Sequence, residues 1–274
     1  MNGSSEGVWR HGDGTNLVGI PSGFIGSADF NAQNRRMRIA GVHEMNHGLF
    51  RMLDASEDDA EAAGMFIAYM AAMFGPDEPR KGHEDDPGAR RRYRTSYMRL
   101  LRGWAYDSNS PEGAVLKGWV ESRFGLFPTY HKQQLNKFNS EAWADYVVEK
   151  MGSRFHNNAI LSQLDLLYEF SQWALRRKAP EPPALRLFRG VNDFNEHRII
   201  EKIDKRRAIL RLNNLVSFTS DRDVASCFGD CILETDVPIS KVLFYRTLLP
   251  RHPLKGEEEI LAIGGDYAVA ASYW

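Results

Sequence analysis

Three short segments in the last third of the sequence carry residues whose types suit chemistry. Arg189 ends an apolar stretch, Ser217 and Thr219 are two positions apart, and Glu257 and Glu259 repeat that spacing. Side chains two residues apart on a β-strand point to the same side, so each pair is expected to share a face. Arg189 has the same parity as the apolar residues Leu185 and Leu187, so its side chain is expected to face the interior of the protein. Each segment alone also fits a surface strand or a solvated acidic run. Together they predict one site.

This set of groups suits cleavage of a bond between ribose and a leaving group. Such cleavage generates an oxocarbenium-like cation, which a nearby carboxylate stabilises, while a second carboxylate takes a proton from the incoming nucleophile. An arginine and hydroxyls would hold a diphosphate and a ribose. These groups fit the nicotinamide–ribose bond of NAD. Dinucleotide binding of the Rossmann type does not fit, because Gly264 and Gly265 come far too late in the chain.

The order and spacing of the segments resemble the Arg-Ser-Glu class of mono-ADP-ribosyltransferases. The matching residues are Leu187–Gly190, Ser217–Ser220 with Ala225 and Phe228 after it, and Glu257–Leu261. The resemblance covers about the last ninety residues. It implies an α+β fold in which a mainly helical N-terminal region precedes a split β-sandwich that binds NAD in its cleft.

The resemblance also implies roles for individual residues in NAD binding and catalysis. Arg189 would hold the NAD diphosphate and ribose, and the backbone near Gly190 would meet the nicotinamide amide. Ser217 would orient the catalytic glutamate, and Thr219 would support the nicotinamide ribose. Glu259 would bind a hydroxyl of that ribose and stabilise the oxocarbenium ion.

Two further roles concern the acceptor and the nicotinamide ring. A glutamate at the position of Glu257 marks class members that modify arginine, so this residue would engage the acceptor guanidinium. Phe228 would pack on the nicotinamide. Asp221 departs from the class, because many relatives keep small or hydroxyl residues there.

Over its whole length the chain is similar to the dinitrogenase reductase ADP-ribosyltransferases of nitrogen-fixing bacteria. The overall length and the segment Thr15–Gly23 carry this match. The resemblance implies transfer of ADP-ribose from NAD, the co-substrate, to an arginine of the nitrogenase iron protein, which reversibly inactivates nitrogenase. It further implies a preference for the ADP-bound iron protein and control by a PII-type signalling protein. No metal is expected.

A second motif predicts different chemistry. His43, Glu44 and His47 form a literal H-E-x-x-H, which on one helix would offer two zinc ligands and a general base to a metallopeptidase. Glu57 and Glu61 are the available third ligands, but both lie in an acidic segment typical of a helix start. The two histidines also border an apolar stripe, so a place at the edge of the core fits them equally. A non-catalytic NAD or ADP-ribose sensor is the third hypothesis, although a sensor does not need two carboxylates.

Patterning divides the chain into two regions. Residues 1–178 comprise a Gly- and Ser-rich segment of irregular or short extended structure, to about residue 34, and then a helical region packed on the core. Residues 179–274 comprise the NAD-binding and catalytic core, after a proline-rich connector. The helices expected are 140–152, 160–178, one through the H-E-x-x-H motif, one capped by Ser56, and 196–210. The strands expected are 185–189, 214–220, 231–237, 242–247 and 258–263.

Composition limits the remaining possibilities. The 274 residues hold 35 basic and 36 acidic side chains, a balance that does not favour nucleic-acid binding. The basic run Arg90–Arg94 follows an acidic one and is interpreted as solvated. Met1 is not followed by a signal-peptide pattern, and the longest apolar stretch is too short to insert in a membrane. The two cysteines, Cys227 and Cys231, predict reduced thiols in the cytoplasm.

Overall fold

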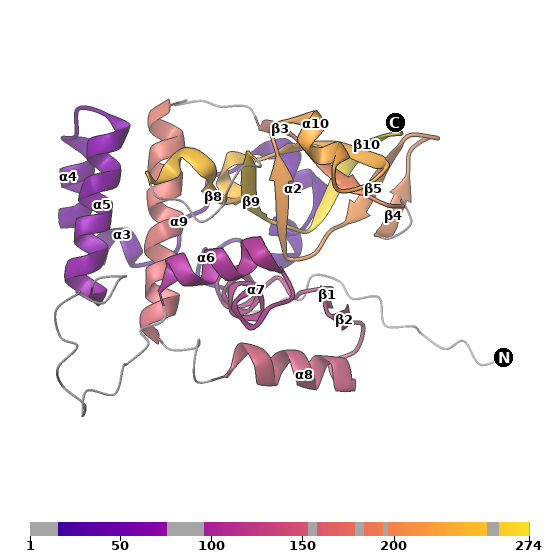
Figure 1. Cartoon of the computed structure of the whole chain (residues 1–274), viewed down its shortest axis with the longest axis horizontal. Helices are drawn as coiled ribbons and strands as arrows, with labels where there is room; N and C mark the ends of the chain where they lie inside the picture. Colours follow the sequence, from indigo (N-terminus) through magenta and orange to yellow (C-terminus); the bar gives the residue numbers. More distant parts are fainter. Residues whose placement is uncertain are drawn as a thin grey trace.

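Antiparallel strands dominate the second half of the chain, and helices the first. The computed structural model describes residues 16–75, 96–152, 158–178, 184–193, 197–250 and 258–273. Within them the main sheet has eight strands in the order β4-β5-β10-β7-β3-β6-β9-β8. The α+β class expected from the sequence is therefore confirmed. Figure 1 shows the sheet at one end of the molecule and the α4–α5 hairpin at the other, with α9 between them.

The helices are α1 (Ser22–Ile25), α2 (Ala28–Gln33), α3 (Val42–Met45), α4 (His47–Asp54), α5 (Asp59–Phe74), α6 (Tyr97–Tyr106), α7 (Pro111–Phe124), α8 (Glu141–Lys150), α9 (Asn158–Lys178) and α10 (Arg222–Ser226). The strands are β1 (Tyr130–His131), β2 (Gln133–Gln134), β3 (Leu185–Val191), β4 (Arg198–Lys202), β5 (Arg207–Arg211), β6 (Leu215–Thr219), β7 (Cys231–Val237), β8 (Val242–Tyr245), β9 (Glu259–Ile263) and β10 (Asp266–Tyr273). Strands β1 and β2 form a small separate hairpin.

Local hydrogen bonds explain where several helices begin. Ser140 caps α8 as expected, since its hydroxyl accepts a hydrogen bond from the backbone N–H of Trp143 at 3.2 Å. The cap predicted at Ser56 is wrong: Asp58 caps α5 by accepting from the N–H of Glu61 at 2.8 Å. The Ser56 hydroxyl donates to the carbonyl of Leu53 at 2.6 Å. A nearby acidic side chain thus replaces the serine as the cap.

The helix expected over residues 196–210 is also wrong, because this segment forms strands β4 and β5 joined by a tight turn. Asp204 makes the turn: its carboxylate accepts hydrogen bonds from the backbone N–H groups of Arg206 and Arg207, each at 2.8 Å. Strand β5 then pairs with β10, which the sequence patterns had not revealed. The irregular structure expected before residue 34 likewise contains helices α1 and α2.

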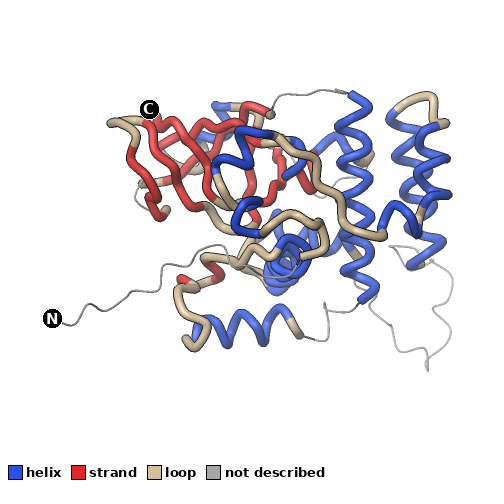
Figure 2. The backbone as a smooth tube through the Cα atoms, turned by 180° about the vertical axis from the view of Figure 1, so that it is seen from behind, coloured by secondary structure: helices blue, strands red, loops and turns tan. Residues whose placement is uncertain are grey.

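One hydrophobic cluster joins the helices to part of the sheet. Its buried members include Trp119 on α7 and Tyr168 on α9, together with Phe244 on β8 and Leu261 on β9. A second cluster lies among the strands and includes Tyr267. The strands and the long helices thus form two adjoining layers, which Figure 2 shows from behind. The division predicted at residues 178 and 179 stays a prediction, and the expected connector lies in undescribed residues 179–183.

Two further sequence-based expectations concern the chain as a whole. Cys227 and Cys231 form no disulfide bond, and the first is exposed while the second is buried. None of the helices in the described ranges combines the length and the apolar character that a bilayer span requires. The basic run Arg90–Arg94 lies outside the described residues.

Burial of one lysine predicts how stability depends on pH. Lys241 is completely buried, 4.8 Å from the ring centroid of Tyr267, and burial lowers its pKa to about 7. Between pH 7 and 10 the unfolded chain binds a proton that the folded chain does not, so the free energy of unfolding should rise with pH. Lys241→Met should remove about a few kcal/mol of this rise in the free energy of unfolding, measured by denaturant titration from pH 6 to pH 9.5.

Lys117 provides the comparison, because it is also buried and has its pKa lowered to about 7. Each single Lys→Met variant should lose part of the rise, and the double variant most of it. Parallel curves for Lys241→Met and the unmodified protein would contradict this account.

Candidate active site

The predicted site residues meet where the sheet is nearly split. Strands β3 and β6 share a single paired position, Phe188 with Thr219, whereas β3 pairs with β7, and β6 with β9, along most of their lengths. The sheet therefore consists of a five-stranded and a three-stranded part that diverge from this point. Arg189, Ser217 and Glu259 lie on the three neighbouring strands β3, β6 and β9.

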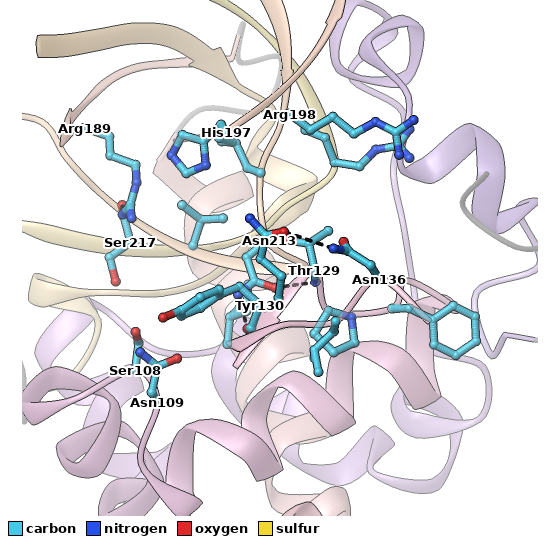
Figure 3. Close-up of a pocket in the computed structure, with 18 of the residues that line it drawn as sticks. Ser108, Asn109, Thr129, Tyr130, Asn136, Arg189, His197, Arg198, Asn213 and Ser217 are labelled. Atoms are coloured by element: carbon cyan, nitrogen blue, oxygen red, sulfur yellow. Dashed lines mark hydrogen bonds between the residues drawn. The ribbon is translucent and has the colours of Figure 1, made fainter. Parts of the chain in front are cut away.

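Hydrogen bonds to Ser217 connect these strands. The Arg189 guanidinium donates through Nη1 to the backbone carbonyl of Ser217 at 2.9 Å, across the split. The Ser217 hydroxyl donates to Oε1 of Glu259. This serine and this glutamate are thus in direct contact, and the orienting role of Ser217 stays a prediction. Figure 3 shows the Arg189 side chain extended toward Ser217.

A third hydrogen bond reaches Ser217 from the helical region. The indole N–H of Trp104, on α6, donates to the Ser217 hydroxyl at 2.8 Å. Trp104 is buried, with 5% of its surface exposed. No sequence pattern indicates this contact, because 113 residues separate the partners and tryptophan at this position fits an ordinary core residue.

The alternation of side chains along β3 places Arg189 and Arg186 on opposite faces of the strand. Arg189 shares a side of β3 with the buried Leu187, in line with the inward orientation expected from the sequence. Arg186 points the other way and is exposed, where it forms ion pairs with Asp236 at 2.8 Å and Glu234 at 3.0 Å. The inward arginine is therefore the one directed at the site.

Residues after β6 set the local geometry of Thr219. Its hydroxyl accepts a hydrogen bond from the backbone N–H of Asp221 at 3.1 Å, and Thr219 lies opposite Glu259 in the β6–β9 register. The Asp221 carboxylate accepts from the N–H groups of Asp223 and Val224, at 2.8 and 3.3 Å, and so caps α10. The aspartate that departs from the class at position 221 thus serves as a helix cap.

Gly190 allows helix α10 to approach β3 closely. A Cβ atom at position 190 would overlap the carbonyl oxygen of Ala225 and would lie 3.1 Å from the Cβ of Phe228. The side chain of Phe228 is half exposed. The two residues predicted to meet the nicotinamide therefore lie next to each other beside Arg189.

The second predicted carboxylate, Glu257, lies outside the described residues. Its neighbour Glu258 has a left-handed backbone, with φ of 44°, so the strand expected from this residue begins one position later. Glu258 instead forms an ion pair with Arg246, 2.6 Å from Oε1 to Nη1. Strand β9 begins at Glu259.

A cavity of about 870 Å³ opens between the sheet and the helical region and includes Arg189 and Ser217 in its wall. This volume is in the range of small-molecule and cofactor sites. The residues of the wall that precede α9 in the chain are Trp104, Ser108, Asn109, Phe127, Pro128, Thr129, Tyr130, Gln134, Leu135, Asn136 and Trp143. The remaining residues in the wall are His197, Arg198, Arg211, Leu212, Asn213, Leu215 and Val216 (Figure 3).

His197 is an uncharged group in a cationic part of this wall. Burial and the positive charge of Arg189 lower the pKa of His197 to about 4, so its imidazole is neutral near pH 7. Its Nε2 atom is buried and has no hydrogen-bond partner within the described part of the chain. Figure 3 places His197 between Arg189 and Arg198. The pattern over residues 196–210 predicts a helix and gives no indication that His197 belongs to the site.

The H-E-x-x-H segment does not have the geometry of a zinc peptidase. The single helix expected through it is wrong, because α3 ends at Met45 and α4 begins at His47, with Asn46 between them. The His43 ring stacks on Phe50 with centroids 4.2 Å apart, while Nδ1 of His47 lies 3.2 Å from the carbonyl oxygen of Glu44. Across the described ranges, three or more potential His, Cys, Asp or Glu ligands do not cluster anywhere.

A split antiparallel sheet that brings an arginine, a serine and a glutamate together on adjacent strands is the arrangement expected of an Arg-Ser-Glu ADP-ribosyltransferase. The chain belongs to the dinitrogenase reductase ADP-ribosyltransferase family, whose sequence model matches residues 15–271. It is similar to the NAD(+)–dinitrogen-reductase ADP-D-ribosyltransferase of Rhodospirillum rubrum. The identity is 60% over 264 residues, which is 96% of each chain. No solved structure shows significant similarity.

The close approach of α10 to β3 yields a stability prediction. Gly190→Ala should lower the free energy of unfolding by about 1–3 kcal/mol, because the new methyl group must displace the backbone of Ala225. Gly64→Ala, in the exposed middle of α5, is the matched control: no atom lies within 4 Å of the added Cβ. It should stabilise by about 0.5–1 kcal/mol. Denaturant unfolding tests both, and equal effects would contradict the packing role.

Proposed function

We propose that this protein transfers ADP-ribose from NAD to an arginine of dinitrogenase reductase, the iron protein of nitrogenase, and so reversibly inactivates nitrogenase. The hydrogen bond from Ser217 to Glu259, beside Arg189, is the observation that carries the proposal. Family membership and the printed activity of the Rhodospirillum rubrum relative support the choice of reaction and substrate.

In this proposal NAD, as co-substrate, lies along the split in the sheet. Arg189 binds the diphosphate and ribose, because its guanidinium is always charged and is directed at the cavity. Backbone groups near Gly190 bind the nicotinamide amide, and Phe228, which lies next to Gly190, packs on the nicotinamide ring. Thr219 supports the nicotinamide ribose from its position opposite Glu259.

The chemistry then proceeds at C1′ of the nicotinamide ribose. The bond from C1′ to nicotinamide breaks, and its electron pair leaves with the ring. Glu259 binds a hydroxyl of that ribose and stabilises the positive charge that develops, while Ser217 holds the carboxylate in place. A guanidinium nitrogen of the acceptor forms the new bond to C1′, and Glu257 engages the acceptor and takes the proton that this nitrogen loses.

Partner recognition belongs to the rest of the chain in this proposal. Residues 179–274 form the NAD-binding core, and the helical region within residues 1–178 takes part in binding the iron protein, whose ADP-bound form is favoured. A PII-type signalling protein regulates the enzyme. The proposal places the reaction in the cytoplasm and assigns it no metal, membrane insertion or nucleic acid.

The segment Asn16–Gly23 is the second candidate for partner recognition. Asn16 organises it: its side-chain amide donates to the carbonyl of Ile20 at 2.6 Å and to the Ser22 hydroxyl at 3.0 Å. The segment thus has a defined conformation at the surface, where Leu17 is exposed.

The substrate assignment predicts direct labelling. Protein incubated with labelled NAD and ADP-bound nitrogenase iron protein should transfer one ADP-ribose group to an arginine, located by peptide mass spectrometry. An iron protein in which that arginine is replaced by lysine is the control and should stay unlabelled. A complete absence of transfer would overturn the proposal and would favour a non-catalytic NAD or ADP-ribose sensor.

The two glutamates should separate bond cleavage from acceptor use. Glu259→Gln should lower both transfer and NAD hydrolysis by about 100-fold or more, because the carboxylate that stabilises the oxocarbenium ion is lost. Glu257→Gln should lose transfer to arginine but retain measurable NAD hydrolysis. Nicotinamide release and protein labelling are measured in parallel. Full transfer by both variants would show that the assigned roles are wrong.

A further inference from the structure

Trp104 brings the helical region into direct contact with the proposed catalytic pair. Its indole N–H lies 2.8 Å from the Ser217 hydroxyl oxygen, and that hydroxyl is hydrogen-bonded to Glu259. The three side chains thus form a chain of contacts from α6 through β6 to β9. Trp104 also forms part of the cavity wall together with Ser217.

The chemistry of these groups sets the direction of both hydrogen bonds. An indole nitrogen can only donate, so Trp104 occupies a lone pair of the Ser217 oxygen. The single hydroxyl hydrogen is then available to Glu259, and an ionised carboxylate can only accept. Without Trp104 the hydroxyl could rotate and serve other partners, because a serine hydroxyl turns readily about its C–O bond.

We propose that Trp104 is a positioning residue, which orients the Ser217 hydroxyl toward Glu259 and so holds the catalytic carboxylate at the ribose. This inference rests on the function proposed above and extends it. The helical region then does more than cover the sheet or bind partners, because it supplies one of the hydrogen bonds that assemble the reaction centre.

Packing under Trp104 fixes its indole ring. The ammonium nitrogen of the buried Lys117, on α7, lies 5.8 Å from the ring centroid. Lys117 is held in turn by the side-chain oxygen of Asn109 at 3.2 Å and the carbonyl oxygen of Tyr130 at 3.0 Å. Helices α6 and α7 also approach closely, since a Cβ atom at Gly103 would overlap the side chain of Glu112. A ring fixed in this way can direct a hydroxyl.

The reaction should depend on Trp104 at the step that transfer and hydrolysis share. Trp104→Phe keeps an aromatic ring but removes the N–H donor. We expect kcat for arginine transfer and kcat for NAD hydrolysis to fall by the same factor, about tenfold, which is typical for the loss of one hydrogen bond at such a site. A change confined to KM for NAD would instead indicate that Trp104 only lines the cavity, and would overturn the proposal.

A double-mutant cycle tests the proposed route through Ser217. If Trp104 acts by orienting that hydroxyl, Trp104→Phe should lower kcat less than twofold in a Ser217→Ala background. Trp173→Phe is the matched control, because it removes another indole hydrogen bond, to Asp54 at 2.7 Å, on helix α9, which contributes no residue to the cavity wall. It should leave kcat unchanged. Additive losses from Trp104→Phe and Ser217→Ala would overturn the positioning role.

A readout without turnover separates this proposal from the proposed function. The indole N–H resonance that disappears in Trp104→Phe belongs to Trp104, and in Ser217→Ala it should shift and exchange faster with solvent. An unchanged resonance would overturn the inferred contact. If the unmodified protein neither transfers ADP-ribose nor hydrolyses NAD while the resonance responds as expected, the proposed function fails although the contact exists. If the unmodified protein is active but the losses from Trp104→Phe and Ser217→Ala are additive, only the positioning role fails.

Discussion

The Ser217 position joins the parts of this structure, because groups from three different elements meet on one residue. Arg189 binds its carbonyl from β3, Trp104 donates to its hydroxyl from α6, and that hydroxyl binds Glu259 on β9. Strands β3 and β6 share only one paired position, so backbone pairing alone holds this point weakly. The hydrogen bond from Arg189, which is stronger where water is excluded, connects the two parts of the sheet across the split.

The helices and one part of the sheet share a hydrophobic cluster, which holds these two layers together. Leu243 and Phe244 on β8 are buried together with residues of α9, and the cavity lies where α6, α8 and the β1–β2 hairpin face the sheet. A cavity with one wall from each layer keeps its shape only if the layers keep their relative position. Apolar packing between α9 and β8 provides that position, and the polar contacts near Ser217 align the side chains within it.

Charge in the cavity is distributed in a way that suits an anionic ligand. Arg189, Arg198 and Arg211 are all in its wall, and His197 between them stays neutral because burial and Arg189 lower its pKa. Arg211 is also held by Asp266 through an ion pair of 2.7 Å. A neutral imidazole beside an arginine avoids repulsion between two cations and leaves the positive charge on the arginine.

The sequence by itself determined the class of fold and the direction of the candidate site residues on the strands. Alternation on β3, β6 and β9 oriented Arg189, Ser217 and Glu259 because side-chain direction in a strand depends only on position. Periodicity failed at residues 196–210, where the turn at Asp204 and pairing with β10 outweigh local propensity. Only the tertiary structure brought Trp104 to Ser217 and His197 to Arg189. Such contacts depend on how layers pack, which local spacing does not encode.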